Sequence, residues 1–491
     1  MNMLSYSQFN IMDDIQSSMF FSNPWKKILI ENFYNNHNVL IYKITEKEVK
    51  SYTGHQIYLY LQVLKRELEK SGIQKYDSIY LESSKNLLSY LSLLLSLTES
   101  YVIFMGDSNL KGLQHITPKW LFLSRKTDEA EQHLYQFIKE IQIDDETIYL
   151  YYLNNGITSS ELQLFYSSSE ITKEKEWIGF SKEQILKNLI RYDRFIKSYQ
   201  YVFSYHPWYM AIGIWMELLI SMFKPLRLIF RYQEDYSNSF YLKEFLSQNL
   251  VDMIVLYPSM IKDFSRNELK LFKNISFAIL TGSVIPFKII EDLKNTDFRI
   301  GYFLLEGGFI FMGEPGEIER NYIGRYFFDN LNIDFYNNNE LVLKSDILCK
   351  CKIKYNHYCI YHDDFWLNTG DIILQKNDKF YFQGRKRYFI SIDFQKWFNP
   401  YELEEILKYY FFIENIVILS DRDYKIKIFV DDRLMILQNE IFSIIKKYFN
   451  DNHIMNSFEV IFIKDNQFYK NYKGEIDKKY FYRLNSMLKT V

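Results

Sequence analysis

The sequence predicts an α/β protein with a largely parallel sheet and helices on its faces, followed by a smaller α+β unit. Near the start, a β run at 39–42, apolar residues at helical spacing over 56–70 and a second β run at 77–81 alternate along the chain, which is typical of parallel sheets. A length of 491 residues exceeds what one hydrophobic core supports, so more than one domain is expected. The C-terminal part reads helix, strand, strand, helix, strand over 400–410, 413–419, 425–430, 433–449 and 459–463.

The most apolar run, 87–105, predicts a buried helix as far as Leu97 and then a buried strand at 101–105. A membrane span is disfavoured, because several Ser and Thr residues and Glu99 interrupt the run. A short apolar run after a helix is instead typical of a strand buried on both faces of a parallel sheet.

The following segments continue the alternation. The polar stretch 124–146 predicts a connecting region before a strand at 147–153. A helix is expected over 181–198, with Ser181 as its N-cap. Two further buried strands are expected within 251–258 and 275–283.

Composition excludes several classes of protein. Hydrophobic residues make up 48% and charged residues 24% of the chain, which indicates a globular protein. A net charge of -2 provides no global field for nucleic acid or an anionic membrane. Three cysteines fit a reducing compartment, and Asp13 and Asp14 stand where a signal peptide needs basic residues. We therefore expect a cytoplasmic protein with no membrane span and no nucleic-acid partner.

One motif offers a fixed carboxylate. Thr369, Gly370 and Asp371 read as a turn that closes an apolar strand, and Asp371 could accept both hydroxyls of a ribose. Alone, these residues are ordinary turn chemistry. Their context is a strand at 379–383, the pair Gly384-Arg385, and a helix that begins after Asn399.

This order of features resembles the adenylate-forming enzymes, which include acyl- and aryl-CoA ligases, peptide-synthetase adenylation domains and luciferases. The resemblance implies a large N-terminal AMP-binding domain over 1–386, with mixed and parallel sheets, helices and a β-rich subdomain. It also implies a small α+β lid domain over 387–491, which would pivot near Arg387 and Tyr388.

The resemblance assigns adenine and ribose contacts. Asp371 would hold the ribose, and Arg385 would bring a guanidinium to the ribose and the phosphates. Gly282 and Ser283 correspond to the turn that touches adenine, and Tyr302 would stack on the base.

The resemblance also assigns a metal ligand and an acid pocket. Glu306 would act in catalysis by holding Mg²⁺, which prefers hard oxygen ligands. Leu305 replaces the threonine that contacts the α-phosphate in the family, so one donor is lost. His206 and Gly213 would line the pocket for the acid.

The phosphate loop is weakened relative to the family. Glycines there let backbone N–H groups close around phosphate oxygens, and a lysine neutralises charge. Ser167, Ser168 and Lys175 keep that pattern, whereas Glu170 adds a negative charge. The glycines themselves are replaced by Ser169, Thr172 and Glu176. An ordinary solvated surface loop is the alternative reading of this segment.

The C-terminal lysine of the family, which bridges the substrate carboxylate and the α-phosphate, is Glu475 here. Lys473 lies two residues earlier and is the best candidate for a substitute, ahead of Lys470 and Lys478. Because of Glu475, adenylation is expected to be slow or absent in this protein, unless Lys473 has taken over the role of the lysine.

A zinc site is an alternative role for the cysteines. Cys349, Cys351 and Cys359 lie close to His357 and His362 in sequence, and these residue types bind zinc. However, Cys349 and Cys351 alternate within an expected strand, where cysteine behaves as a small buried hydrophobe.

Two functions follow from the resemblance. The first is a stand-alone ligase that activates a fatty or aryl carboxylic acid with ATP and Mg²⁺ and transfers it to the thiol of CoA or of a carrier-protein phosphopantetheine. A carrier is expected in trans. The second is a catalytically impaired homologue that acts as a binding or assembly protein.

Overall fold

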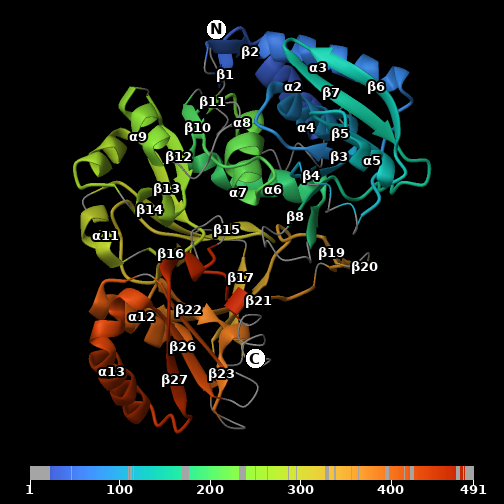
Figure 1. Cartoon of the computed structure of the whole chain (residues 1–491). Helices are drawn as coiled ribbons and strands as arrows, with labels where there is room; N and C mark the ends of the chain where they lie inside the picture. Colours follow the sequence, from blue (N-terminus) through green and yellow to red (C-terminus); the bar gives the residue numbers. More distant parts are fainter. Residues whose placement is uncertain are drawn as a thin grey trace.

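The computed structural model describes residues 23–481 except 46, 109, 111–112, 114–115, 168–175, 199, 232–238, 249, 263, 286, 295, 327–330, 337–338, 355–356, 363, 393–396, 414, 421–424, 471–475 and 479. Within these residues, the strands form a 13-stranded, a nine-stranded, a three-stranded and a two-stranded sheet. Figure 1 shows most of the nine-stranded sheet at the upper right, the parallel part of the 13-stranded sheet at the upper left, and the C-terminal unit below; β17, β21 and β22 of the 13-stranded sheet extend down to that unit.

The nine-stranded sheet has the order β20-β19-β9-β8-β4-β3-β5-β7-β6. Its centre is parallel, and antiparallel hairpins form both edges. The strands are β3 (Ser78–Glu82), β4 (Val102–Gly106), β5 (Trp120–Leu123), β6 (Gln136–Ile143), β7 (Glu146–Tyr152), β8 (Leu164–Ser167), β9 (Trp177–Phe180), β19 (Cys351–Lys354) and β20 (His357–Ile360).

The prediction for 124–146 was wrong. This segment contains the short helix α5 (Asp128–Gln132) and the edge strand β6, which forms a hairpin with β7. β6 alternates between more exposed and more buried residues along most of its length, because an edge strand covers the core with one face only. The polar residues on its exposed face therefore make this strand resemble a connecting region in the sequence.

The 13-stranded sheet has the order β17-β18-β21-β22-β16-β15-β14-β13-β12-β10-β11-β1-β2. The strands from β14 to β1 in this order are parallel, and the remaining pairs are antiparallel. The parallel strands and β2 are β1 (Val39–Ile44), β2 (Val49–Thr53), β10 (Tyr201–Ser204), β11 (Arg227–Arg231), β12 (Met253–Leu256), β13 (Phe277–Thr281) and β14 (Arg299–Leu304). The others are β15 (Gly308–Met312), β16 (Tyr322–Tyr326), β17 (Asn332–Tyr336), β18 (Glu340–Lys344), β21 (Leu367–Lys376) and β22 (Lys379–Arg385).

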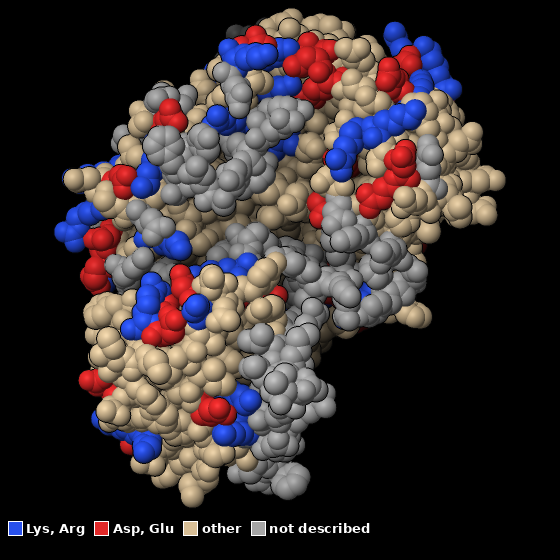
Figure 2. Space-filling model, viewed as in Figure 1, with Lys and Arg blue, Asp and Glu red and all other residues tan. Residues whose placement is uncertain are grey.

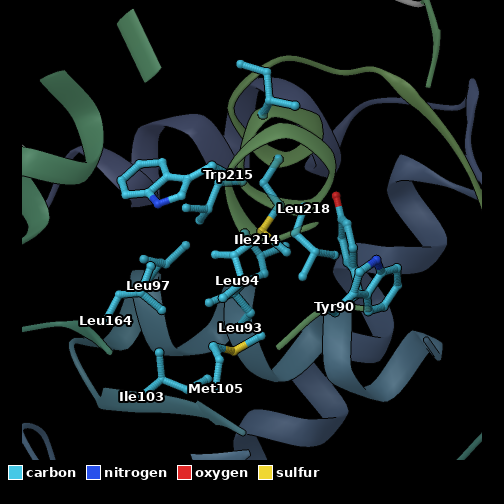
Figure 3. Packing of buried hydrophobic residues seen from close by; sticks show 14 of the residues in the cluster. Tyr90, Leu93, Leu94, Leu97, Ile103, Met105, Leu164, Ile214, Trp215 and Leu218 are labelled. Atoms are coloured by element: carbon cyan, nitrogen blue, oxygen red, sulfur yellow. The ribbon is translucent and has the colours of Figure 1, made fainter. Parts of the chain in front are cut away.

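The largest apolar core lies between the two sheets, since it includes residues of both and of the helices between them. Figure 3 shows Leu93, Leu94 and Leu97 of one helix packed against Ile214 and Leu218 of another. The helices of this region are α2 (Pro24–Leu29), η2 (Ile30–Tyr34), α3 (Gly54–Lys70), α4 (Leu87–Glu99), α6 (Lys182–Tyr192), α7 (Ala211–Gly213), η5 (Ile214–Leu219) and α8 (Ile220–Phe223).

A second core covers the outer face of the 13-stranded sheet. It involves α9 (Ser239–Gln248), α10 (Pro258–Ile261), the 3₁₀ helix η6 (Glu268–Asn274) and α11 (Phe287–Leu293). The prediction for 87–105 is confirmed: helix α4 is buried in the main core, and β4 follows it. Among the described residues, no helix has both the length and the hydropathy of a membrane span.

The C-terminal residues form an α+β unit with cores of their own. Its elements are η7 (Lys386–Tyr388), β23 (Ile390–Ser391), β24 (Trp397–Phe398), α12 (Pro400–Phe411), β25 (Ile416–Ser420), β26 (Ile426–Asp431), η8 (Asp432–Leu437), α13 (Gln438–Asp451), β27 (Phe458–Ile463) and η9 (Asp465–Gln467). The helix predicted over 433–449 begins as the 3₁₀ helix η8 and becomes α-helical only at Gln438.

Two further boundaries differ from expectation. Helix α6 is capped by Ser181 as predicted, but it ends at Tyr192 and continues as the 3₁₀ turn η4 (Asp193–Phe195). Strand β19 begins at Cys351, so Cys349 lies outside it.

Figure 2 shows Lys and Arg side chains interspersed with Asp and Glu side chains over the described part of the visible face. Among the described residues, oppositely charged groups form ion pairs such as that of Arg325 with Glu317 at 2.5 Å. On this face, therefore, positive charge lies beside negative charge.

Candidate active site

Several of the predicted residues lie where four parallel strands end. Strands β10, β12, β13 and β14 run in the same direction, so their carboxyl ends lie at one edge of the sheet. His206 follows β10, Gly282 and Ser283 follow β13, and Glu306 follows β14. In open α/β sheets, ligands bind outside the carboxyl ends of the strands.

Asp371 reaches this edge because the long sheet bends back on itself. Between β14 and β21 lie β15, β16 and β22, so the two strands would be about 19 Å apart in a flat sheet. However, the Tyr302 hydroxyl on β14 donates a hydrogen bond of 2.6 Å to Asp371 Oδ2 on β21. Residues of these strands and of neighbouring segments pack together as one apolar cluster.

The predicted turn at Thr369, Gly370 and Asp371 lies inside a strand instead of closing one. Strand β21 continues through all three residues to Lys376. Gly370 has a φ of +72°, which favours glycine, and the registers of β21 with β18 and β22 shift near this point. The irregularity locally interrupts the regular strand pairing next to Asp371.

The Asp371 carboxylate is buried, with 4% of the residue exposed. The pKa of this carboxyl is raised, mainly because burial disfavours its charged form. The charge of Arg385 and the hydrogen bond from Tyr302 act in the opposite direction, but their effect is smaller. Oδ1 accepts no hydrogen bond from any described residue; its ion-pair neighbour is Arg385 Nε at 3.3 Å. A buried carboxylate oxygen without a donor is costly, and a ribose hydroxyl is the kind of donor that would satisfy it.

Arg385 lies directly opposite Asp371 in the β21–β22 register. Its side chain is 46% exposed, so the guanidinium is accessible at the rim of the site. The structure therefore brings together three predicted nucleotide residues, Asp371, Tyr302 and Arg385.

Glu306 has a cationic partner that sequence analysis missed. Lys352 Nζ on β19 donates a hydrogen bond of 2.6 Å to Glu306 Oε1, and the Cys349 backbone N–H donates one of 2.7 Å to the Glu306 carbonyl. Lys352 gave no signal in the sequence, because it is one of several lysines that alternate with apolar residues along this strand.

Ser167 ends strand β8 and is buried. The neighbouring Tyr166 hydroxyl donates to the Leu305 carbonyl and accepts a hydrogen bond of 2.9 Å from Trp215 Nε1. These bonds tie the strand before the predicted phosphate loop to the turn that carries Glu306. Ser168, Lys175, Lys473 and Glu475 lie outside the described residues.

His206 belongs to a fully buried polar network. Its Nδ1 lies 2.8 Å from Glu217 Oε1, and Glu217 also accepts hydrogen bonds from the Ser204 hydroxyl and two backbone N–H groups. Burial alone would raise the pKa of Glu217, but His206 and its other neighbours lower it. The lone carboxylate in the apolar run 211–223 is a signal that sequence analysis could have used.

Two buried polar atoms near the strand ends have no hydrogen-bond partner among the described residues: His206 Nε2 and the Thr281 hydroxyl. Thr281 ends β13, directly before the predicted Gly282 and Ser283 turn, and sequence analysis missed it. Gly213 packs so closely that an added Cβ would lie 2.5 Å from the Pro207 carbonyl oxygen. Gly213 therefore packs closely against the His206 turn.

The cysteines do not form a compact cluster with histidine. Cys349 and Cys351 are buried, whereas Cys359 is exposed on β20. Burial raises the pKa of the Cys349 thiol well above its usual range and that of Cys351 to about 11. Among the described residues, no group of three or more His, Cys, Asp or Glu side chains could hold a metal ion.

No protein-family model and no curated protein sequence matches the chain. Solved structures match its fold over nearly the whole length. ATP-bound MatB from Rhodopseudomonas palustris has a TM-score of 0.73 at 11% identity, over 95% of this chain and 99% of that chain. The anthranilate CoA ligase AuaEII in complex with anthranoyl-AMP has a TM-score of 0.71 at 13% identity, over 97% and 99%. O-succinylbenzoate coenzyme A synthetase (MenE) from Bacillus subtilis, in complex with ATP and magnesium ion, has a TM-score of 0.69 at 13% identity, over 92% and 98%.

The chain therefore has the fold of the adenylate-forming enzymes, and the predicted fold class is confirmed. Within that superfamily, the structures that it resembles include acid–CoA ligases bound to ATP or to an acyl-AMP. A shared fold leaves the activity of this chain to be argued from its own site.

Proposed function

We propose that this protein is an AMP-forming acid–thiol ligase of the cytoplasm. The observation that carries the proposal is the Asp371 carboxylate, which is buried, lies beside the carboxyl ends of parallel strands and keeps one oxygen without a hydrogen bond from the described residues. Its placement in a fold shared with ATP-bound and AMP-bound proteins supports a ribose as the missing partner.

The proposed reaction has two steps. A carboxylate oxygen of a fatty or aryl acid attacks the α-phosphorus of ATP, the bond to the β-phosphate oxygen breaks, and pyrophosphate leaves. A thiolate of CoA or of a carrier-protein phosphopantetheine then attacks the acyl carbon, and AMP leaves.

The described residues would bind and orient the nucleotide. Asp371 Oδ1 would accept a ribose hydroxyl, while Tyr302 holds Oδ2 and would lie against the base. Arg385 would provide positive charge at the rim. His206, held by Glu217, would line the acid pocket with its Nε2 atom.

Bound Mg²⁺ would neutralise the ATP phosphates, and Glu306 is the residue that the family resemblance assigns to it. Here that carboxylate is already paired with the Lys352 ammonium. This pairing does not fit a Mg²⁺ ion bound to Glu306, and the proposed reaction does not require one there.

ATP–pyrophosphate exchange with a panel of fatty and aryl acids tests this function and identifies the acid. The expected result is acid-dependent exchange that Asp371→Ala abolishes. Thioester formation with CoA, or with a carrier protein added in trans, then identifies the thiol. Exchange that is unaffected by Asp371→Ala would contradict the proposal.

A binding or assembly role is the second candidate, because several residues of the family's chemistry are replaced. Glu475 stands at the lysine position, Leu305 at the threonine, and Ser169, Thr172 and Glu176 at the loop glycines. Loss of one electrostatic group of this kind typically costs about 10² to 10³ in rate.

Three variants separate the two candidates. If Lys473 has replaced the lost lysine, Lys473→Ala abolishes exchange and Glu475→Ala does not. If no residue has replaced it, Glu475→Lys raises exchange above background. Nucleotide binding without exchange in any of these proteins would favour the binding role.

A further inference from the structure

The pair of Lys352 and Glu306 joins the two chain segments that flank the expected phosphate position. Lys352 lies opposite Ile178 in the pairing of β19 with β9, and β9 directly follows the predicted phosphate loop, which ends at Glu176. Glu306 lies in the turn after β14. The ammonium thus lies between the strand that follows the loop and the end of β14.

The surroundings hold Lys352 in its charged form. Both side chains are largely shielded, with 16% and 17% exposed. Burial alone would lower the pKa of Lys352, but the charges and the hydrogen bond of Glu306, together with the charge of Glu176, raise it above its ordinary value. Tyr361 also lies close to this group.

The ammonium and a divalent ion would compete for the same carboxylate. Mg²⁺ requires hard oxygen ligands in a near-octahedral shell, and Glu306 Oε1 already accepts the Lys352 hydrogen bond at 2.6 Å. Binding of Mg²⁺ to Glu306 would bring like charges together or displace the lysine from a largely buried position.

We propose that Lys352 provides the cation beside Glu306 in place of a protein-bound divalent ion, and that its ammonium interacts with the nucleotide phosphates. This inference rests on the proposed function, which puts a nucleotide at Asp371. Glu306 lies four residues after Tyr302, whose hydroxyl contacts Asp371, so one nucleotide can reach both residues. Mg²⁺ would then enter only as the counter-ion of ATP.

Isothermal titration calorimetry of the full chain with ATP and with AMP, each in Mg²⁺ and in EDTA, tests this inference. The wild type is expected to bind ATP nearly as well in EDTA as in Mg²⁺. Lys352→Met should weaken ATP binding in EDTA by about tenfold or more, the effect of losing a charged hydrogen bond. AMP, which lacks the β- and γ-phosphates, should be affected less.

Three further variants control the experiment. Lys352→Arg should retain ATP binding in EDTA because it keeps the charge. Lys354→Met removes an exposed lysine two residues along the same strand and should change nothing. Glu306→Gln should tighten ATP binding in EDTA, because the ammonium loses its carboxylate partner; a metal-ligand role for Glu306 predicts weaker binding in Mg²⁺ instead.

Two outcomes would overturn the inference alone: ATP binding by Lys352→Met that equals the wild type, or wild-type binding that requires Mg²⁺ and loses this requirement in Glu306→Gln. Failure of the proposed function gives a different pattern, in which the wild type binds neither ATP nor AMP, or Asp371→Ala binds both unchanged. That pattern would overturn both.

Discussion

The Tyr302 hydroxyl and the Asp371 carboxylate form a buried polar contact at the candidate nucleotide site. Their atoms lie 2.6 Å apart, and burial raises the pKa of both groups. One oxygen of Asp371 is thus held by the protein, and the other accepts no hydrogen bond from the described residues. The pair therefore positions the carboxylate and leaves one acceptor for a ligand.

Asp371→Ala is expected to weaken ATP and AMP binding by about 1.5 to 3 kcal/mol, the usual value of a hydrogen bond to a charged group. Calorimetry measures this change directly. As a control, Asp378→Ala removes an exposed carboxylate that pairs with Arg325 and should bind both nucleotides like the wild type. Equal affinities of wild type and Asp371→Ala would refute the ribose assignment.

Tyr302→Phe should lower the stability of the protein without lowering its affinity for the nucleotide. Loss of the hydroxyl leaves the buried Asp371 Oδ2 without its donor, which costs about 1 to 3 kcal/mol of folding free energy. In the complex, the ribose could then use both carboxylate oxygens, so nucleotide affinity is preserved or increased. Denaturant unfolding and calorimetry on the same preparation test both parts, and a parallel loss of stability and affinity would contradict this account.

At the scale of elements, strand β21 presents Asp371 by way of an irregularity at Gly370. Gly370 and the distant Gly72, which follows helix α3, both have positive φ values, +72° and +90°, and neither would bring an added Cβ within 4 Å of another atom. The two glycines therefore have the same kind of backbone conformation and free space, but only Gly370 lies next to Asp371.

Alanine at either position is expected to lower stability by about 1 to 2 kcal/mol, because left-handed backbone strains a residue with a Cβ. Only Gly370→Ala should also weaken nucleotide binding, since it alters the backbone beside Asp371. Thermal unfolding and calorimetry of both variants separate the effects. Equal nucleotide binding by the two would mean that the irregularity does not position Asp371.

Glu317 holds strands β16 and β22 together. Its carboxylate lies 2.5 Å from Arg325 Nη2 and 2.9 Å from Lys379 Nζ. The hydrogen bond from Arg325, with those from Tyr322 and Lys379, lowers the pKa of Glu317 despite its partial burial. A lowered folded-state pKa stabilises the protein above the unfolded-state pKa, and this stabilisation is lost as the pH falls.

Glu317→Gln is therefore expected to lower the melting temperature most at neutral pH. The difference from the wild type should shrink as the pH falls below about 4.3, the ordinary pKa of glutamate. Glu314→Gln, whose carboxylate is 70% exposed and pairs with Arg299, should have little effect at either pH. A difference in melting temperature between Glu317→Gln and the wild type that grows as the pH falls would contradict this explanation.

At the scale of the whole molecule, the C-terminal unit is joined to the body through η7 and a small set of polar contacts. Tyr401 donates to Asn321 at 3.1 Å, and Asn399 donates to the Gln383 carbonyl at 2.6 Å. Residues 385–387 are exposed. We propose that the boundary between a large domain and a lid domain lies here, at 386 and 387.

Limited digestion with trypsin is expected to cut first within 385–387, because exposed connections with few contacts are cleaved before packed elements. The products should be a large N-terminal fragment and a C-terminal fragment of about a hundred residues. ATP with a substrate acid should change the rate of this cut if the lid rotates. Cleavage only at other sites, with no effect of ligands, would argue against a mobile lid.

Local patterns in the sequence determined the order and type of most elements. Helices α3 and α6, the caps Ser181 and Asn399, and the buried pair α4 and β4 were all predictable, because apolar spacing and capping act between residues a few positions apart. The family resemblance added the fold and indicated Asp371, Tyr302 and Arg385 as neighbours.

Only the tertiary structure decided which side chains meet at the site. Tyr302 and Asp371 are 69 residues apart in sequence, and Lys352 and Glu306 are 46 apart. The first contact depends on the bend of the 13-stranded sheet, and the second joins the nine-stranded sheet to the turn after β14. Both arise from packing across the whole domain and leave no local pattern. For the same reason, the family resemblance assigned Glu306 to Mg²⁺ without indicating that Lys352 lies beside it.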